Sequence, residues 1–241
     1  MFPLDGGVLN LKAFYDGIRH ALFKGRISHA QVNGIDGVLE AWEDHGTGLV
    51  RHLSYVLATV HHETGGRMVP VREGLAKSDA QARRIVRHRK YGKPAGPYAH
   101  VYYGRGHVQL TWLENYRRSS IDAGVDLVKN PDAMLDPVIS ARILVKGMLD
   151  GRWNGRGKEL EAYLSRSRAD YMNARRTVNV TDKWQRIKGL SLAYERALGA
   201  ALRPVGHKPP PDVPKPKKPT PPRRKTLLGL ILDLFSKLFR R

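Results

Sequence analysis

The sequence predicts a mainly helical domain that is followed by a proline-rich linker and a short amphipathic helix. Three observations support this prediction. Apolar residues recur at three- and four-residue steps through residues 8–62, and comparable patterns return several times between residues 113 and 202. The composition changes abruptly at Pro204, because nine of the 15 prolines lie within residues 204–222. The last stretch, residues 226–241, again has apolar residues at helical spacing.

The first part of the chain predicts three successive helices. The first covers residues 9–23, where apolar residues follow helical steps. The second, residues 28–42, begins with a serine that can cap a helix. The third, residues 50–62, precedes the pair Gly65-Gly66, which is typical of a helix end.

The middle of the chain predicts a less regular region before the helices resume. Residues 78–89 fit a basic helix, residues 91–99 fit a loop rich in glycine and proline, and residues 102–112 fit a short extended piece. Further helices are expected at residues 113–123, 137–150, 158–175 and 182–202. The irregular or β element is therefore small.

The chain carries a strong excess of positive charge. Its 42 Lys and Arg residues against 22 Asp and Glu residues give a formal net charge of +20. Such a charge favours an anionic partner: nucleic acid, anionic lipid or a bacterial envelope. The absence of cysteine excludes disulfide bonds, thiolate zinc sites and a cysteine nucleophile.

The N-terminal residues lack the features of a secretion signal. Residues 1–7 contain Asp5 and no basic segment before an apolar run. No stretch approaches the roughly 18–20 apolar residues of a membrane-spanning helix. We therefore expect synthesis in the cytoplasm of a host cell without a signal peptide.

Two segments follow the expected domain of residues 1–202. Residues 203–225 form a basic linker, in which dense proline prevents helix or sheet formation. Residues 226–241 place apolar side chains on one helix face and polar side chains on the other. From residue 203 onward, 11 Lys or Arg residues accompany two acids, a net charge of +9. This helix is typical of binding to an anionic membrane or lipopolysaccharide; packing against the domain and pairing with a second copy are the alternatives.

The segment HHETGG, residues 61–66, contains the first candidate for chemistry. It places the carboxyl group of Glu63 at the end of an apolar helix, just before a glycine break. Apolar neighbours raise the pKa of such a carboxyl group and keep it protonated near neutral pH. A general acid for a glycosidic oxygen requires this property. An ordinary solvated glutamate at a helix end is the alternative.

The segment YYGRGHVQLTW, residues 102–112, is the second candidate. Glycines flank Arg105, and Gln109 and Thr111 follow on alternating positions. This pattern fits polar groups along the floor of a cleft. It also fits a tight turn that enters a core strand or helix.

Together these segments resemble glycoside hydrolase family 19, the family of plant-type chitinases and of many phage endolysins. The resemblance covers about residues 8–200 and rests on HHETGG (61–66), YYGRGHVQLTWLENY (102–116) and RRTVN (175–179). Residues 13–42 look like the phage branch. The resemblance implies a lysozyme-like, two-lobed helical fold and an inverting mechanism.

The resemblance also implies a catalytic pair. The family's general acid falls on Glu63, and its general base is an acidic residue of the following loop. Between Glu63 and Tyr103 the acids are Glu73 and Asp79. Glu73 follows the acid at a distance similar to that in the phage members, whereas Asp79 looks like the start of a helix. Inversion needs carboxyl groups roughly 6.5–9.5 Å apart, and we expect this separation or a somewhat wider one.

Other positions carry over as substrate-binding residues. Gln109, Thr111 and Asn115 fall on the polar residues that bind sugar or position the water, and Tyr103 and Arg105 belong to the same motif.

A later pair of positions carries over with a departure from the family pattern. Asn179 matches the Asn of the family's I-N-G-G motif, and Arg186 matches a following cleft arginine. Val180-Thr181 replaces the two glycines, which indicates a trimmed, more open cleft. The histidines lack H-E-x-x-H spacing, so we expect no metal and no other cofactor.

Charge favours one of the two substrates that the resemblance allows. Chitin is neutral, whereas bacterial walls bear stem-peptide carboxylates and Gram-negative surfaces carry phosphate-rich lipopolysaccharide, both of which attract a cationic protein. We therefore expect a phage endolysin that hydrolyses peptidoglycan as an N-acetylmuramidase. It would act at the cell wall or periplasm after release by a holin.

Three alternatives remain open at this point. A chitinase would use the same catalytic pair. A lytic transglycosylase forms 1,6-anhydro sugars without water and would survive the loss of Glu73. A basic nucleic-acid-binding protein is a non-enzymatic alternative, but the sequence shows no aromatic-interleaved basic motif, and Glu63 and Glu73 would then have no role.

Overall fold

The computed structural model of the chain describes residues 3–153 and 158–204. The predicted helix at residues 226–241, and the linker beyond residue 204, lie outside the described residues. The structure is mainly helical, as the sequence predicts. Its α-helices are α1 (Leu11–Phe23), α2 (His29–His45), α3 (Val50–Glu63), α4 (Asp79–Val86), α5 (Leu113–Ala123), α6 (Pro137–Asp150), α7 (Tyr171–Ala174) and α8 (Trp184–Ala201).

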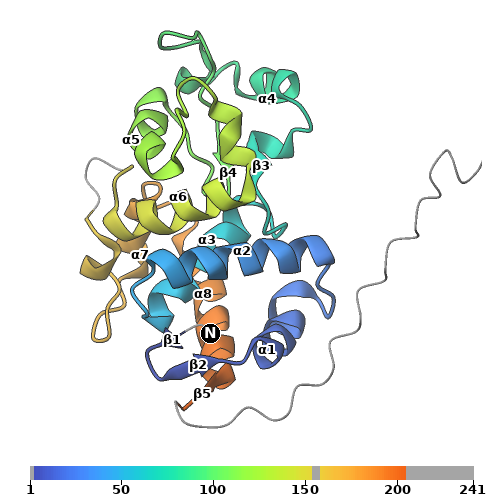
Figure 1. Cartoon of the computed structure of the whole chain (residues 1–241), viewed down its shortest axis with the longest axis vertical. Coiled ribbons are helices and arrows are strands. Elements are labelled where there is room, and N and C mark those ends of the chain that lie inside the picture. The colour runs from blue at the N-terminus through green and yellow to red at the C-terminus, as the bar shows by residue number, and fades with distance from the viewer. Residues whose placement is uncertain (1–2, 154–157, 205–241) are drawn as a thin grey trace, which may run out of the picture. The chain divides into compact units, whose positions relative to one another are not determined.

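The helices are arranged in two lobes (Figure 1). α1 and α8 lie in the lower lobe, and α4 and α5 lie in the upper lobe. α2 and α6 pack side by side between them. The lysozyme-like, two-lobed helical fold is thereby confirmed.

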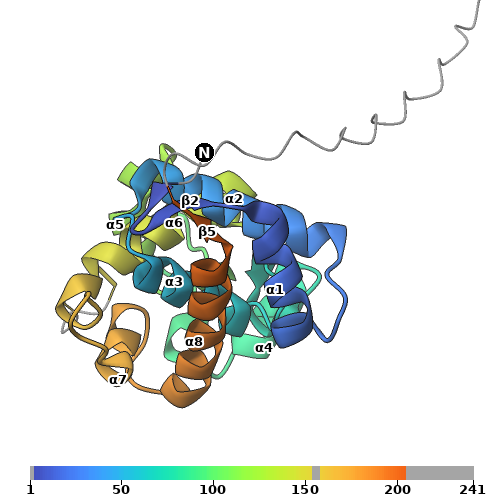
Figure 2. The ribbon, with the colours of Figure 1, turned by 90° about the horizontal axis from the view of Figure 1, so that it is seen from below.

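α3 is the central helix of the hydrophobic core. It packs along α8, and α1 covers another part of α8 (Figure 2). All residues from His52 to Val60 are buried, and each fully buried large apolar side chain stabilises the fold by roughly 1.5–3 kcal/mol. This burial fixes the end of α3, where Glu63 lies.

Two small antiparallel sheets complete the fold. β1 (Pro3–Leu4), β2 (Gly7–Leu9) and β5 (Leu202–Arg203) join the two ends of the described domain. β3 (Val71–Arg72) pairs with β4 (Arg105–Gly106). The second sheet connects the loop after Glu63 to the segment of residues 102–112.

The start of α2 follows its predicted capping residue. Ser28 caps α2 by accepting a hydrogen bond from the backbone N–H of Gln31, whose side chain accepts one from Ser28. The helix predicted at residues 158–175 is wrong. A 3-10 turn at Leu160–Ala162 and the four-residue α7 occupy this stretch. Between them, the Ser165 hydroxyl accepts hydrogen bonds from the backbone of residues 167 and 168, which competes with a helix.

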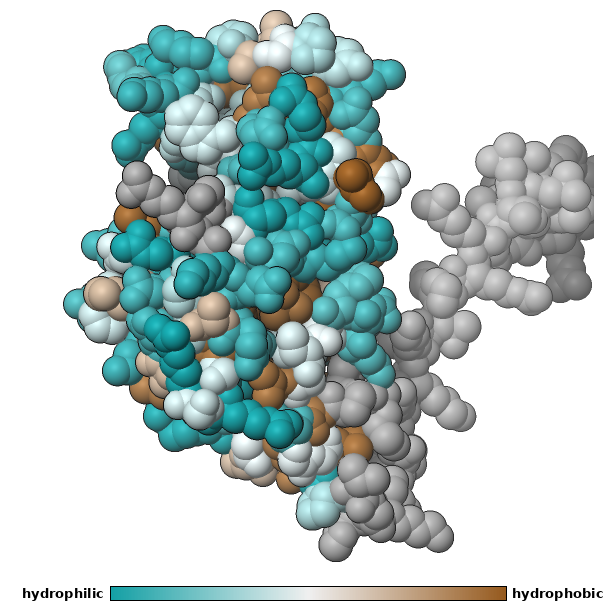
Figure 3. Space-filling view, turned by 90° about the vertical axis from the view of Figure 1, so that its left-hand side faces the viewer, coloured by the Kyte–Doolittle hydropathy of each residue, from teal (hydrophilic) through white to brown (hydrophobic). Residues whose placement is uncertain are grey.

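The outer surface is polar on the face shown in Figure 3, where apolar residues form small, separate groups. None of the helices within residues 3–153 and 158–204 combines the length and the apolar character that crossing a membrane requires.

Candidate active site

Glu63 is the last residue of α3, and the chain turns sharply after it. The Thr64 hydroxyl donates to the Val60 carbonyl at 2.7 Å and accepts from the backbone N–H of Met68 at 3.0 Å. Gly65 and Gly66 follow with φ values of 58° and 78°, which glycine adopts without strain. The predicted helix end at this pair is confirmed.

A buried arginine contacts the Glu63 carboxyl group. The Arg175 Nη1 lies 2.7 Å from the Glu63 Oε1, and the two side chains are 1% and 15% exposed. Arg175 also donates through Nε to the backbone carbonyl of Asp182 at 3.2 Å. Burial raises the pKa of Glu63 above its ordinary value, although the Arg175 charge and hydrogen bond act in the opposite direction. Burial therefore shifts Glu63 toward the protonated form that a general acid needs, against the opposing effect of Arg175.

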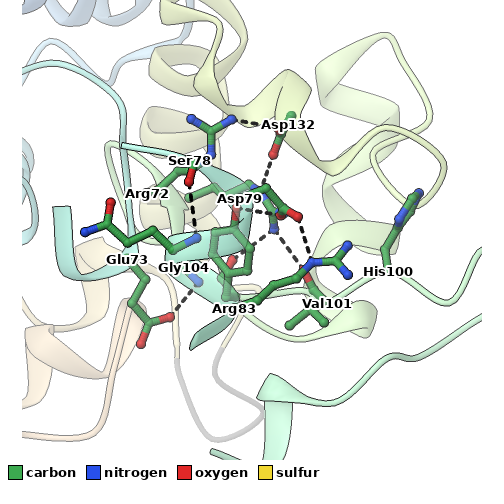
Figure 4. Close-up of polar contacts among 12 residues, drawn as sticks. Arg72, Glu73, Ser78, Asp79, Arg83, His100, Val101, Gly104 and Asp132 are labelled. Carbon is green, nitrogen blue, oxygen red and sulfur yellow. Dashed lines mark hydrogen bonds and ion pairs between the residues drawn. The ribbon is translucent and has the colours of Figure 1, made fainter. Parts of the chain in front are cut away.

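Glu73 follows β3 directly and is held by two hydrogen bonds. The Tyr91 hydroxyl donates to Oε1 at 2.6 Å, and the backbone N–H of Gly104 donates to Oε2 at 2.8 Å. Figure 4 shows the carboxylate pointing away from Asp132 and the neighbouring ion pairs. A Cβ atom at position 104 would lie 3.2 Å from Oε2, so glycine permits this close approach. The β3–β4 pairing thus fixes both the position and the orientation of Glu73.

Both carboxyl groups line one polar cleft of about 520 Å³. The structure brings Glu63 and Glu73 together there, and their separation in the inverting range stays a prediction. Four of the residues predicted to bind substrate share the cleft, namely Gln109, Thr111, Asn115 and Asn179. The aromatic residues of its lining are Tyr91, Trp112 and Trp153.

The polar residues of the cleft floor are oriented by the backbone around them. The Gln109 side-chain amide donates to the carbonyl groups of Val71 and Gly106 at 3.0 and 3.1 Å. The Asn115 amide donates to the Thr111 carbonyl at 2.9 Å. The side-chain oxygens of Gln109 and Asn115 are therefore left as acceptors for a sugar hydroxyl or amide. Gln109 has a φ of 54°, a left-handed conformation that costs roughly 1–3 kcal/mol and clusters at functional sites.

Trp112 gives the cleft an exposed aromatic surface. Its side chain is 47% exposed, and its backbone has a φ of 75°. Its ring meets the Tyr91 ring edge-on, with 5.4 Å between the centroids. The sequence motif contained Trp112, but nothing in its spacing distinguished a cleft tryptophan from a core tryptophan.

The structure corrects the prediction for Tyr103 and Arg105, which do not line the cleft. Arg105 is 2% exposed and binds Asp132 at 2.7 Å and Asp79 at 3.3 Å. It stacks over the Tyr103 ring at 3.5 Å, and the Tyr103 hydroxyl donates to Asp79 at 3.0 Å. Figure 4 shows Asp79 and Asp132, which belong to this network, apart from the Glu73 carboxylate. Because both side chains are buried and occupied, they support the β3–β4 loop and do not contact sugar.

Arg186 also lies outside the cleft lining. It is exposed on α8. Desolvation by burial is the main cause of the lowered pKa of His61 and of His62, and the positive charge of Arg186 lowers both further. Burial lowers the pKa of His61 to about 4, and His61 shares a hydrogen bond of 3.1 Å with the Tyr194 hydroxyl. Within the described residues, no group of three or more His, Asp or Glu side chains is placed to hold a metal ion.

Sequence reasoning missed two residues of the site. Arg175 belongs to the RRTVN segment, but its ion pair with Glu63 spans more than a hundred positions. Tyr91 lies in the segment expected to be a loop, and its contact with Glu73 depends on how residues 87–92 fold back toward the cleft. No local pattern marked either contact.

A mainly helical, two-lobed fold with two carboxyl groups in one polar cleft is the arrangement of a glycoside hydrolase. Residues 44–148 match the chitinase class I family, which is glycoside hydrolase family 19. The matched segment, which contains Glu63, Glu73 and the residues of the cleft floor, is similar to this family.

Curated relatives match a short part of the chain. The acidic endochitinase pcht28 of Solanum chilense is 51% identical over 47 residues, which are 18% of this chain and 19% of the relative. Endochitinase A2 of Pisum sativum is 52% identical over 40 residues, which are 16% of this chain and 12% of the relative. The match thus spans less than a fifth of the length of these relatives.

Solved structures match most of the chain. Chitinase C of Streptomyces griseus covers 83% of this chain with 23% identity and a TM-score of 0.51, over 79% of its own length. A bacterial family 19 chitinase gives the same identity, coverage of this chain and TM-score over 98% of its own length. These similarities show that the fold is shared.

Proposed function

We propose that this protein is a phage endolysin that hydrolyses the β-1,4 bond between N-acetylmuramic acid and N-acetylglucosamine in bacterial peptidoglycan. The observation that carries the chemistry is the pair of carboxyl groups in one cleft, of which Glu63 is only 15% exposed and has a raised pKa. The family and its endochitinase relatives support hydrolysis of chitin-like glycans.

Each carboxyl group has a separate role in an inverting reaction. Glu63 donates its proton to the glycosidic oxygen as the bond between this oxygen and C1 breaks. Glu73 accepts a proton from a water molecule, and the water oxygen forms the new bond to C1 on the opposite face of the sugar ring. The hydrogen bonds from Tyr91 and Gly104 hold the Glu73 carboxylate in place for this step.

Arg175 supports the same reaction from the side of the acid. Once Glu63 has given up its proton, its carboxylate carries a charge in a buried position. The Arg175 guanidinium, 2.7 Å away, stabilises this charge. Burial therefore favours the protonated form of Glu63 before the proton transfer. Arg175 then reduces the free-energy cost of forming the Glu63 carboxylate.

The substrate class is proposed from charge. A net charge of +20 gives no electrostatic attraction to neutral chitin, but it attracts the carboxylates of a bacterial wall. A chitinase remains the second candidate, because the relatives named above are endochitinases. A lytic transglycosylase needs no second carboxylate, so the held position of Glu73 argues for hydrolysis.

A first test uses purified Gram-negative sacculi and mass spectrometry of the released fragments. We expect hydrated fragments with reducing N-acetylmuramic acid ends, and loss of these fragments in both Glu63→Gln and Glu73→Gln. Anhydro ends that persist without Glu73 would identify a transglycosylase. Cleavage of chitin oligomers alone would leave the mechanism and overturn the substrate.

We further propose that residues 226–241 bind an anionic membrane or lipopolysaccharide, and that the protein acts at the cell wall after release by a holin. The amphipathic pattern of this segment supports the first proposal. Liposome co-sedimentation tests it with Leu234→Asp on the apolar face and Ser236→Asp on the polar face, which add the same charge. Equal binding of the two variants would count against membrane binding through the apolar face.

A further inference from the structure

A strongly cationic surface lies beside the cleft. Residues 77–93 contain seven Lys or Arg residues and one acid, and all seven cations are exposed. The acid, Asp79, already pairs with Arg83 and with buried Arg105. The remaining cations form no ion pair with a described residue. We call them the cationic face: Lys77, Arg84, Arg87, Arg89, Lys90 and Lys93.

The local fold leaves these cations exposed on and around α4. α4 buries Ala82 and Val86 in a small apolar cluster, which leaves its arginines exposed. The chain then folds back on the end of α4, since the backbone N–H of Arg89 donates to the Val86 carbonyl at 2.7 Å. A Cβ atom at Gly92 would lie 1.9 Å from the same carbonyl oxygen, so only glycine allows this return. Lys90 and Lys93 are thereby placed near the end of α4.

The cationic face is attached to the wall of the cleft that carries Glu73. Tyr91, which follows Lys90 directly, lines the cleft and donates its hydrogen bond to Glu73 at 2.6 Å. On the other side of the segment, Ile85 of α4 packs against Gly74, where a Cβ atom would lie 2.8 Å from the Ile85 Cδ1. Figure 1 shows α4 in the upper lobe together with β3. A polymer bound at Glu73 therefore passes close to the cationic face.

We propose that the cationic face binds carboxylate groups that branch from the glycan in the cleft, namely the stem-peptide carboxylates of peptidoglycan. This inference rests on the proposed function and assigns its substrate preference to specific residues. A neutral glycan offers these cations no opposite charge, whereas carboxylates offer the charge and match the donor geometry of arginine. The position next to Tyr91 favours a branch of the bound glycan over a separate anionic surface.

The test compares two triple variants of the full chain that lose the same charge. R84Q/R87Q/K93Q removes three cations of the face and leaves Tyr91 and its neighbours Arg89 and Lys90 intact. K24Q/R26Q/R196Q removes three exposed cations elsewhere. The substrates are intact sacculi and sacculi whose carboxylates have been converted to amides. We expect kcat/KM on intact sacculi to fall about tenfold in the face variant relative to the matched variant, and the two variants to be equal on amidated sacculi.

The other outcomes separate the explanations. Equal activity of the two variants on intact sacculi would refute the inference. A fall of the same size on amidated sacculi would also refute it, because the cations would then act without carboxylates. A loss of binding to lipopolysaccharide vesicles, with sacculi cleaved normally, would overturn it in favour of a lipid surface. If the unmodified protein released no fragments from either preparation of sacculi, the proposed function itself would fail.

Discussion

Replacing Tyr91 with phenylalanine removes a single oxygen atom and tests whether Glu73 must be held in place. The lost hydrogen bond joins the Tyr91 hydroxyl to the Glu73 Oε1 at 2.6 Å. A hydrogen bond to a charged group contributes roughly 1.5–3 kcal/mol. The Gly104 N–H still holds the other oxygen, and water can reach the partly exposed Tyr91, so we expect the lower end of this range. Because about 1.4 kcal/mol corresponds to a factor of ten in rate, kcat should fall about tenfold with KM little changed.

The assay is release of reducing ends from sacculi, with Tyr98→Phe as the matched control. Tyr98 is exposed and lies in the neighbouring loop, so its variant should keep full activity. An unchanged kcat for Tyr91→Phe would refute the positioning role, and so would an equal fall in kcat for Tyr98→Phe.

Three further predictions concern stability as well as activity. Glu63→Gln should lower kcat by about a hundredfold or more. The same variant should raise Tm at pH 7, because burial raises the pKa of Glu63 and disfavours its ionised form. This gain in Tm should vanish below the ordinary pKa of 4.5, where the carboxyl group is protonated in the folded and the unfolded state. Thermal unfolding measured at several pH values tests both expectations. Arg105→Met removes the buried cation that pairs with Asp79 and Asp132, so it should lower the free energy of unfolding by about 3 kcal/mol. This loss corresponds to a Tm lower by roughly 6–12 °C. An unchanged Tm would contradict a stabilising role of the buried network. Gly34→Ala should lower the free energy of unfolding by roughly 1–3 kcal/mol, because its Cβ atom would lie 2.0 Å from the Met68 carbonyl oxygen. Gly37→Ala on the same helix is the control: its Cβ atom would meet open space, so this variant should be slightly more stable. Denaturant titrations measure both changes.

The helical part of the fold could be predicted because local signals determine it. α2 begins at a serine with a reciprocal cap, and α3 ends at two glycines with positive φ. The stretch of residues 158–175 was mispredicted for a local reason as well. Its apolar residues keep helical spacing, but the Ser165 hydroxyl satisfies the backbone in a turn. The spacing of apolar residues does not reveal this competition between a helix and a side-chain-stabilised turn.

The site could be predicted only as far as its motifs are continuous in sequence. Glu63, Gln109 and Thr111 lie in short motifs, and the structure places all three in the cleft. Arg105 lies in the same kind of motif, between two glycines that suggest exposure. Its burial depends on Asp79 and Asp132, which are 26 and 27 positions away. Such long-range partners decide whether an arginine faces substrate or supports the backbone, and a single sequence does not reveal them.

The two candidate catalytic carboxyl groups are attached to different elements of the fold. Glu73, Gly104 and Gln109 are tied together by the β3–β4 ladder and its hydrogen bonds. Glu63 is instead attached to the core helices around α3. A shift of the ladder relative to α3 would therefore change the gap that the attacking water must occupy. We expect a crosslink between the ladder and α3 to change the rate without replacing a side chain of the site.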